Sequence, residues 1–201
     1  MRILVLGGAR SGKSAWAERL LAGERGVDYV ATARPFPGAD GFDADFGARI
    51  AEHRLRRPAS WRTVDDVDAV TALRRPSPGN HVLLDDVGTW LTGVIDREGL
   101  WDSPRGSVHP WCDELVGAGR EWPARDVGDA GAADAAGDAD DAHLVVVTPE
   151  VGMGVIPEHR SGRLFRDEIG LLNGRLAEVC DRVVLVVAGC PVAVKGPGIN
   201  Y

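Results

Sequence analysis

The first 21 residues, MRILVLGGARSGKSAWAERLL, constrain the fold more than any other part of the chain. A short apolar run, Ile3–Leu6, ends in glycine, and the spacing of apolar residues over Ala15–Leu21 predicts a helix. Between them, the octet GGARSGKS matches every fixed position of the phosphate-binding loop pattern. A strand, a glycine-rich loop and a helix therefore follow one another in the order that this motif requires.

The chemistry of phosphate binding explains the residue types in the octet. Glycines allow backbone conformations that aim consecutive N–H groups at phosphate oxygens, and a helix N-terminus adds partial positive charge. Lys13 is expected to reach the β- and γ-phosphate oxygens and Ser14 to bind Mg²⁺. A tight turn with a solvent-facing lysine is the alternative, and the flanking strand and helix favour phosphate binding. The predicted nucleotide contacts are Gly7, Gly8, Ala9, Arg10, Ser11, Gly12, Lys13 and Ser14.

Strand and helix patterns alternate along the rest of the chain. Further strands are expected at Val27–Thr32, His81–Asp85, Leu144–Thr148 and Arg182–Ala188. Helices are expected at Asp43–Arg57, Asp65–Arg74, Thr89–Ile95, Cys112–Trp122 and Arg160–Val179, with a loop at Asp102–Pro110. This order predicts an α/β fold of the P-loop NTPase type, with a mainly parallel β-sheet flanked by helices. We expect one domain over residues 1–201, with a flexible Ala/Asp/Gly-rich insertion at 123–141.

Composition limits the classes of partner. The net charge of -7 opposes a general role on nucleic acid. No apolar run approaches the roughly 20 residues that cross a bilayer, so we expect no membrane insertion and a cytoplasmic location. Cys112, Cys180 and Cys190 lack the spacing of a zinc site or a disulfide framework.

A second metal ligand is expected at the end of the strand HVLLD. Magnesium bound to a triphosphate usually takes an acidic residue as well as the loop hydroxyl, and Asp85 has the expected position. Asp86 follows directly, and the alternation of side chains along a strand allows only one of the two to face the metal. We favour Asp85 as the metal ligand. Both aspartates serving only as caps is the remaining alternative.

The segment RIAEHRLRRPASWRT combines one histidine with several arginines. On a helix, Arg49, His53 and Arg57 share one face because they are four residues apart. An exposed basic face with an idle histidine is the plain interpretation. The sharper hypothesis is that the arginines hold a polyphosphate while His53 acts as a neutral nucleophile.

Several stretches together resemble one family, the bifunctional adenosylcobinamide kinase/adenosylcobinamide-phosphate guanylyltransferases of cobalamin biosynthesis. The matching stretches occur in the family's order and cover most of the chain outside 123–141: GGARSGKS, YVAT, RIAEHRLRRPASWRT, LLDDVGTWLT and VTPEVGMGVIPEHRSGRLFRDEIGLLNGRLAE.

The resemblance implies a two-step enzyme. It phosphorylates the aminopropanol hydroxyl of adenosylcobinamide with ATP or GTP, and then transfers GMP from GTP to that phosphate through a guanylylated histidine, which falls on His53. The resemblance also implies a homotrimer. By similarity, further GTP contacts fall on Thr32, Ala33, Arg34, Arg54, Leu55, Arg56, Arg57, Asp65 and Asp85.

Two other functions stay open on the residues alone. One is a phosphate-loop kinase for another small molecule, in which His53 has no catalytic role. The other is a nucleotide-dependent switch. The loop motif indicates a nucleotide, and the rest of the site must define the acceptor.

Overall fold

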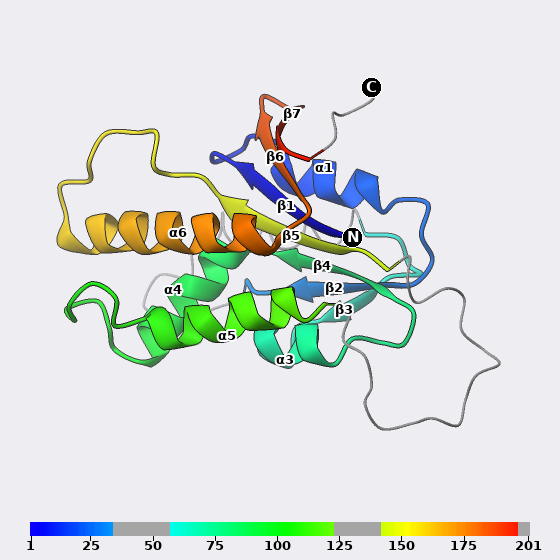
Figure 1. The fold of residues 1–201 in the computed structure, drawn as a ribbon, viewed down its shortest axis with the longest axis horizontal. Helices are drawn as coiled ribbons and strands as arrows, with labels where there is room; N and C mark the ends of the chain where they lie inside the picture. Colours follow the sequence, from blue (N-terminus) through cyan, green and yellow to red (C-terminus); the bar gives the residue numbers. More distant parts are fainter. Residues whose placement is uncertain (34–56, 123–141, 197–201) are drawn as a thin grey trace.

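The computed structural model describes residues 1–33, 57–122 and 142–196, which form one sheet covered by helices (Figure 1). The sheet has seven strands in the order β3-β2-β4-β5-β1-β6-β7. The strands are β1 (Arg2–Gly7), β2 (Val27–Ala31), β3 (Arg62–Val64), β4 (His81–Asp85), β5 (Leu144–Pro149), β6 (Arg182–Val187) and β7 (Cys190–Lys195). The helices are α1 (Lys13–Leu20), α3 (Ala69–Arg74), α4 (Val87–Arg97), α5 (His109–Arg120) and α6 (Arg160–Val179).

All neighbouring strands are parallel except β6 and β7, which pair antiparallel. The central strands are buried on both faces, which explains why they are continuous apolar runs. Leu4 of β1 packs into a core with α3, α4, α5 and α6, whereas Ile3 and Val5 pack with α1 on the other face. The α/β fold with a mainly parallel sheet is confirmed.

The carboxyl ends of the central strands meet at one edge of the sheet. In the register, Gly7 of β1 lies opposite Pro149 of β5, and Asp85 of β4 lies opposite Val147. The glycine-rich loop and the acidic end of β4 are therefore brought to the same edge, where open α/β sheets bind their ligands.

Two strands occur where none was predicted, β3 and β7. Strand β3 is joined to β2 by a buried carboxylate, because Asp28 accepts hydrogen bonds from Arg62 Nε (3.0 Å) and Nη2 (2.9 Å). The same carboxylate accepts from the backbone N–H of Ser77 (2.7 Å) and from Asn80 Nδ2 (2.9 Å). Burial raises the pKa of Asp28, but these bonds outweigh burial and lower it.

Several helix boundaries differ from the prediction, and two of them differ because of capping. Helix α3 begins at Ala69 and not at Asp65, since the side chain of Asp68 accepts from the N–H of Val70 (2.9 Å). Helix α4 begins before Thr89, since Asp86 caps it. Helix α5 begins at His109, inside the predicted loop. The predicted helix Asp43–Arg57 and the predicted insertion at 123–141 lie outside the described residues, apart from Arg57.

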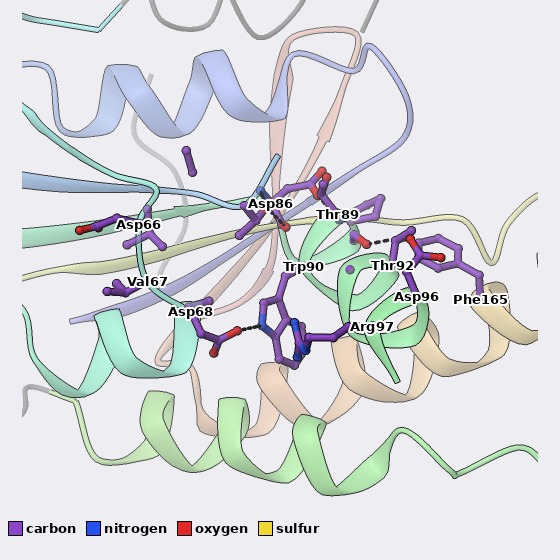
Figure 2. A pocket seen from close by; sticks show the side chains of 17 residues that line it. Asp66, Val67, Asp68, Asp86, Thr89, Trp90, Thr92, Asp96, Arg97 and Phe165 are labelled. Atoms are coloured by element: carbon purple, nitrogen blue, oxygen red, sulfur yellow. Dashed lines mark hydrogen bonds between the residues drawn. The ribbon is translucent and has the colours of Figure 1, made fainter. Parts of the chain in front are cut away.

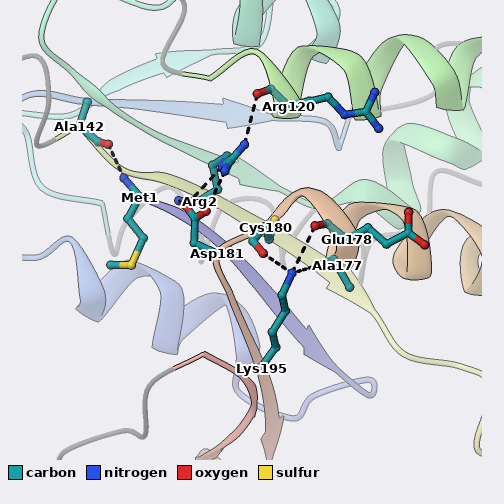
Figure 3. Close-up of polar contacts among 9 residues, drawn as sticks. All are labelled: Met1, Arg2, Arg120, Ala142, Ala177, Glu178, Cys180, Asp181 and Lys195. Atoms are coloured by element: carbon teal, nitrogen blue, oxygen red, sulfur yellow. Dashed lines mark hydrogen bonds and ion pairs between the residues drawn. The ribbon is translucent and has the colours of Figure 1, made fainter.

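Polar contacts tie the ends of β1, β6 and β7 together (Figure 3). Arg2 forms an ion pair with Asp181, with Nη2 2.7 Å from Oδ1. Lys195 Nζ donates to the carbonyl oxygens of Ala177 (2.7 Å), Glu178 (3.2 Å) and Cys180 (2.7 Å) at the end of α6. These acceptors are carbonyls that a helix leaves without partners at its C-terminus.

No helix within the described ranges is both long and apolar enough to cross a membrane. The three cysteines are free thiols; Cys112 and Cys180 are buried and Cys190 is exposed.

Candidate functional site

The glycine-rich loop connects β1 to α1 through backbone conformations that ordinary residues rarely adopt. Arg10 has φ 56° and Gly12 has φ 88°. A Cβ at Gly7 would lie 2.4 Å from Ser11 Oγ and 2.8 Å from the carbonyl oxygen of Val186. The loop thus depends on glycine for close packing at its start and for a left-handed conformation directly before α1.

The turn between β6 and β7 supports this loop from the side. The N–H of Gly189 donates to the carbonyl oxygen of Ser11 at 2.8 Å. A Cβ at Gly12 would lie 3.2 Å from Gly189 Cα, so the two backbones approach closely. The carbonyl of Gly7 accepts from the N–H of Glu150 at 3.0 Å. The loop is therefore held from two neighbouring strands before any ligand binds.

The acidic end of β4 is bonded to the loop. Ser14 Oγ donates to Asp85 Oδ1 at 3.0 Å, and Tyr29 Oη donates to Asp85 Oδ2 at 2.5 Å. Burial raises the pKa of Tyr29, and the charge of Asp85 and their hydrogen bond raise it further, so the phenol stays a donor. Tyr29 thereby fixes the orientation of the Asp85 carboxylate toward Ser14.

The hydroxyl of Ser14 and the carboxylate of Asp85 fit Mg²⁺. Both offer hard oxygen ligands, and they lie within one hydrogen bond of each other. Magnesium commonly takes only one or two protein oxygens and completes its shell with phosphates and water. Accordingly, a cluster of three metal-ligating side chains is not required, and none occurs in residues 1–33, 57–122 and 142–196. The metal role of the two residues stays a prediction.

Asp86 has a different partner from Asp85. Its Oδ1 accepts from the N–H (2.7 Å) and from Oγ1 (2.8 Å) of Thr89, and so caps α4. Its backbone exchanges two hydrogen bonds with Thr32 Oγ1, at 2.7 and 2.9 Å. Burial, and then the charge of Asp85, raises the pKa of Asp86. The two neighbouring aspartates thus have different roles: Asp85 bonds to the glycine-rich loop and Asp86 caps α4.

Arg57 ends the basic segment and reaches the same site. Its guanidinium carbon lies 3.5 Å from the centroid of the Tyr29 ring, and Nη1 donates to Thr63 Oγ1 at 3.1 Å. Arg57 and Asp65 line a recess of about 420 Å³. The structure therefore joins Arg57, Tyr29, Asp85 and Ser14 in one series of contacts.

The remaining predicted contacts divide into two groups. Thr32 and Ala33 follow β2 at the same edge of the sheet, and Thr32 lines a larger pocket. The other predicted site residues lie outside the described residues: Arg34, His53, Arg54, Leu55 and Arg56. Arg57, which lies over the Tyr29 ring, is the first described residue after this segment.

Two residues that support the site were not predicted, Tyr29 and Gly189. The stretch YVAT predicts a strand and is one of the stretches that resemble the family, but neither inference assigns a role to Tyr29. The dipeptide Ala188–Gly189, with φ 51° and 79°, lies between two apolar runs and is a hairpin signal. That signal would have predicted β7 and the contact with the loop.

Comparison with known proteins agrees with these features. The family model described as cobinamide kinase / cobinamide phosphate guanyltransferase matches residues 3–194. The bifunctional adenosylcobalamin biosynthesis protein CobP of Pseudomonas aeruginosa is 38% identical over 200 residues, which cover 98% of each chain. The corresponding protein CobU of Escherichia coli is 37% identical over 205 residues, covering 97% of this chain and all of that one.

Among solved structures, the RadB recombinase aligns with a TM-score of 0.46 at 16% identity, over 92% of this chain and 73% of that chain. At this identity and TM-score, the likeness supports no conclusion about function. The family model and the relatives extend over nearly the whole chain, and they include the loop, the end of β4 and the last helix. The chain therefore belongs to the cobinamide kinase/cobinamide phosphate guanyltransferase family of enzymes.

Proposed function

We propose that this chain phosphorylates adenosylcobinamide with ATP or GTP and then transfers GMP from GTP to adenosylcobinamide phosphate. The product is adenosylcobinamide-GDP. The observation that carries the proposal is the bonded series Ser14, Asp85 and Tyr29 beside a glycine-rich loop, in a chain of this family. The series supports a nucleotide site, and family membership supports the acceptor.

In the first step, the loop residues hold the triphosphate. Backbone N–H groups of the loop and of the start of α1 would bind the phosphates, apart from the N–H of Ser11, which donates to the carbonyl oxygen of Gly8 at 3.3 Å. Lys13 would reach the β- and γ-oxygens. Ser14 and Asp85 would hold Mg²⁺, which neutralises charge on the phosphates when bound. The hydroxyl of the acceptor attacks the γ-phosphorus, the bond to the β-oxygen breaks, and the hydroxyl proton leaves to solvent or to a base.

In the second step, an imidazole nitrogen of His53 attacks the α-phosphorus of GTP. A phosphorus–nitrogen bond forms, the bond between the α-phosphorus and the bridging oxygen breaks, and pyrophosphate leaves with its charge held by the loop and Lys13. A phosphate oxygen of the acceptor then attacks the phosphoramidate and releases His53. Splitting the transfer in this way means that the acceptor phosphate meets one charged phosphoryl group and not the whole triphosphate.

The proximity of Arg57 to Tyr29 supports this role for the basic segment. Tyr29 contacts both the guanidinium of Arg57 and the carboxylate of Asp85, so Arg57 places positive charge beside the nucleotide site. Guanine nucleotide contacts by Thr32, Ala33, Arg34, Arg54, Leu55, Arg56, Arg57 and Asp65 belong to the same proposal. So do a homotrimeric assembly and a cytoplasmic location, where ATP and GTP are available.

Product analysis by mass spectrometry tests the proposal. Wild type, Lys13→Ala and His53→Ala are each incubated with adenosylcobinamide, ATP, GTP and Mg²⁺. We expect the histidine variant to stop at the phosphorylated intermediate and the lysine variant to form little of either product. Wild type that produces neither compound would contradict the proposed function, and His53→Ala that produces the GDP-linked compound at the normal rate would contradict the intermediate.

A further inference from the structure

A pocket of about 770 Å³ lies at the carboxyl edge of the sheet, on the face covered by α4 (Figure 2). The ends of β2, β4 and β5 form one wall, through Thr32, Asp86 and Pro149. Helix α4 forms the opposite wall, through Thr92 and Gly93, and Phe165 of α6 closes one side. None of the nucleotide chemistry described above uses this space, except for its border at Thr32.

The pocket and the phosphate-binding loop share a wall. Asp86 lines the pocket and follows Asp85, which is bonded to Ser14 of the loop. Pro149 lines the pocket and pairs in register with Gly7, the first residue of the loop. A hydroxyl group bound against this wall would therefore lie at the strand ends where the loop holds the terminal phosphate.

The charge of the pocket opposes a nucleotide. Four carboxylates line it, those of Asp66, Asp68, Asp86 and Asp96, whereas Arg97 is its one basic residue among the described lining residues. A triphosphate would be repelled by this excess of negative charge. A neutral or cationic ligand rich in N–H donors would be favoured instead.

Among the residues that the structure describes, part of this acceptor capacity receives no hydrogen bond. Asp68 is occupied by the N–H of Val70 and by Trp90 Nε1 (3.3 Å), and Asp96 Oδ1 accepts from Trp101 Nε1 (2.6 Å). Asp96 Oδ2 and both oxygens of Asp66 accept no hydrogen bond from another described residue. These oxygens, together with the exposed faces of apolar and aromatic side chains, define an amphipathic pocket.

We propose that this pocket binds the corrinoid acceptor through its aminopropanol arm and the adjoining amide side chains. The assignment rests on the proposed function. A corrinoid before phosphorylation carries primary amides that donate hydrogen bonds, an apolar macrocycle and no phosphate, which matches the carboxylates and the aromatic walls of the pocket.

The rest of the macrocycle is too large for the pocket and meets the segment that follows Pro149. Met153, Val155 and Ile156 of this segment are 79%, 94% and 69% exposed. Large apolar side chains exposed in the segment directly after a residue that lines the pocket are available to bind a ligand.

Gly93 provides a direct steric test. A Cβ at this position of α4 meets no heavy atom within 4 Å, so a larger side chain enters the pocket. Gly170 of α6 is also helical, exposed and without atoms within 4 Å of its Cβ, but does not line the pocket. Gly93→Trp is therefore the test variant and Gly170→Trp its matched control.

Equilibrium dialysis measures Kd for adenosylcobinamide, followed by its visible absorbance, and for labelled GTP. We expect Gly93→Trp to raise the adenosylcobinamide Kd by about tenfold or more, and to change the GTP Kd by less than about twofold. Gly170→Trp should leave both values within about twofold of wild type. Asp66→Asn keeps the shape of the side chain and removes one carboxylate. It should raise the adenosylcobinamide Kd by about threefold or more and leave the GTP Kd unchanged.

An unchanged adenosylcobinamide Kd in Gly93→Trp, with wild type turning over adenosylcobinamide, would overturn the assignment alone. A rise in the GTP Kd of Gly93→Trp as large as the rise in its adenosylcobinamide Kd would also overturn the assignment, because the pocket would then hold nucleotide. Wild type that forms no product from adenosylcobinamide would remove the proposed function and this assignment together.

Discussion

We expect the two lysines of the chain to have separable roles, one in nucleotide binding and one in stability, and replacing each one by methionine tests this. Lys195 donates to three carbonyl oxygens at the end of α6, two of them at 2.7 Å. A hydrogen bond made by a charged group contributes about 1.5–3 kcal/mol, and a cation at a helix C-terminus adds about 0.3–1 kcal/mol. Because Lys195 is exposed, we take about 2 kcal/mol as the loss of unfolding free energy in Lys195→Met. For a chain of this length, about 2 kcal/mol lowers Tm by about 4–8 °C.

Differential scanning fluorimetry without nucleotide measures this loss, and GTP binding supplies the reciprocal readout. The side chain of Lys13 makes no hydrogen bond or ion pair with another described residue. Lys13→Met should therefore keep the wild-type Tm and lose GTP affinity, whereas Lys195→Met should lose Tm and keep GTP affinity. A wild-type Tm in Lys195→Met would refute the capping role, and a matching fall of Tm in Lys13→Met would refute the separation of roles.

Three other predictions concern acidic residues and thiols. The folded-state pKa of Asp28 is below the unfolded value of about 3.9, so the stability that it contributes is present at neutral pH and is lost as pH falls through the folded pKa. Urea unfolding of Asp28→Asn should therefore show a smaller loss of unfolding free energy between about pH 5 and pH 3 than wild type. Equal losses in the two proteins would contradict this. Asp85→Asn should weaken GTP binding by about tenfold or more in buffer with Mg²⁺ but not in buffer with EDTA. Equal weakening of GTP binding in both buffers would show that Asp85 does not act through the metal. Burial raises the pKa of Cys112 and Cys180 to about 12, so a thiol reagent should label only Cys190 quickly in the native protein, and rapid labelling of all three would contradict their burial.

The central strands could be predicted because their physics is local. Strands β4 and β5 are buried on both faces and therefore appear in the sequence as continuous apolar runs. Strand β3 has only three residues, two of them exposed, and depends on the distant carboxylate of Asp28. Strand β7 is an edge strand that contains Pro191, which weakens the sequence pattern.

The candidate site could be predicted in part for a similar reason. The loop is a contiguous motif, and Asp85 ends a recognisable strand, so both follow from local sequence. Tyr29 required knowledge of which face of β2 meets the loop. The large pocket is assembled from strand ends and from residues of α3, α4 and α6, which are far apart in the chain, and no local pattern indicates it.

Covalent labelling shows whether His53 carries the GMP group during the transfer. Wild type and His53→Ala are incubated with α-labelled GTP and Mg²⁺ without acceptor, denatured and separated from free nucleotide. We expect acid-labile label on wild type and none on His53→Ala. We also expect wild type to lose the label when adenosylcobinamide phosphate is added. Equal labelling of the two proteins, or GDP-linked product from a wild type that never carries label, would contradict it.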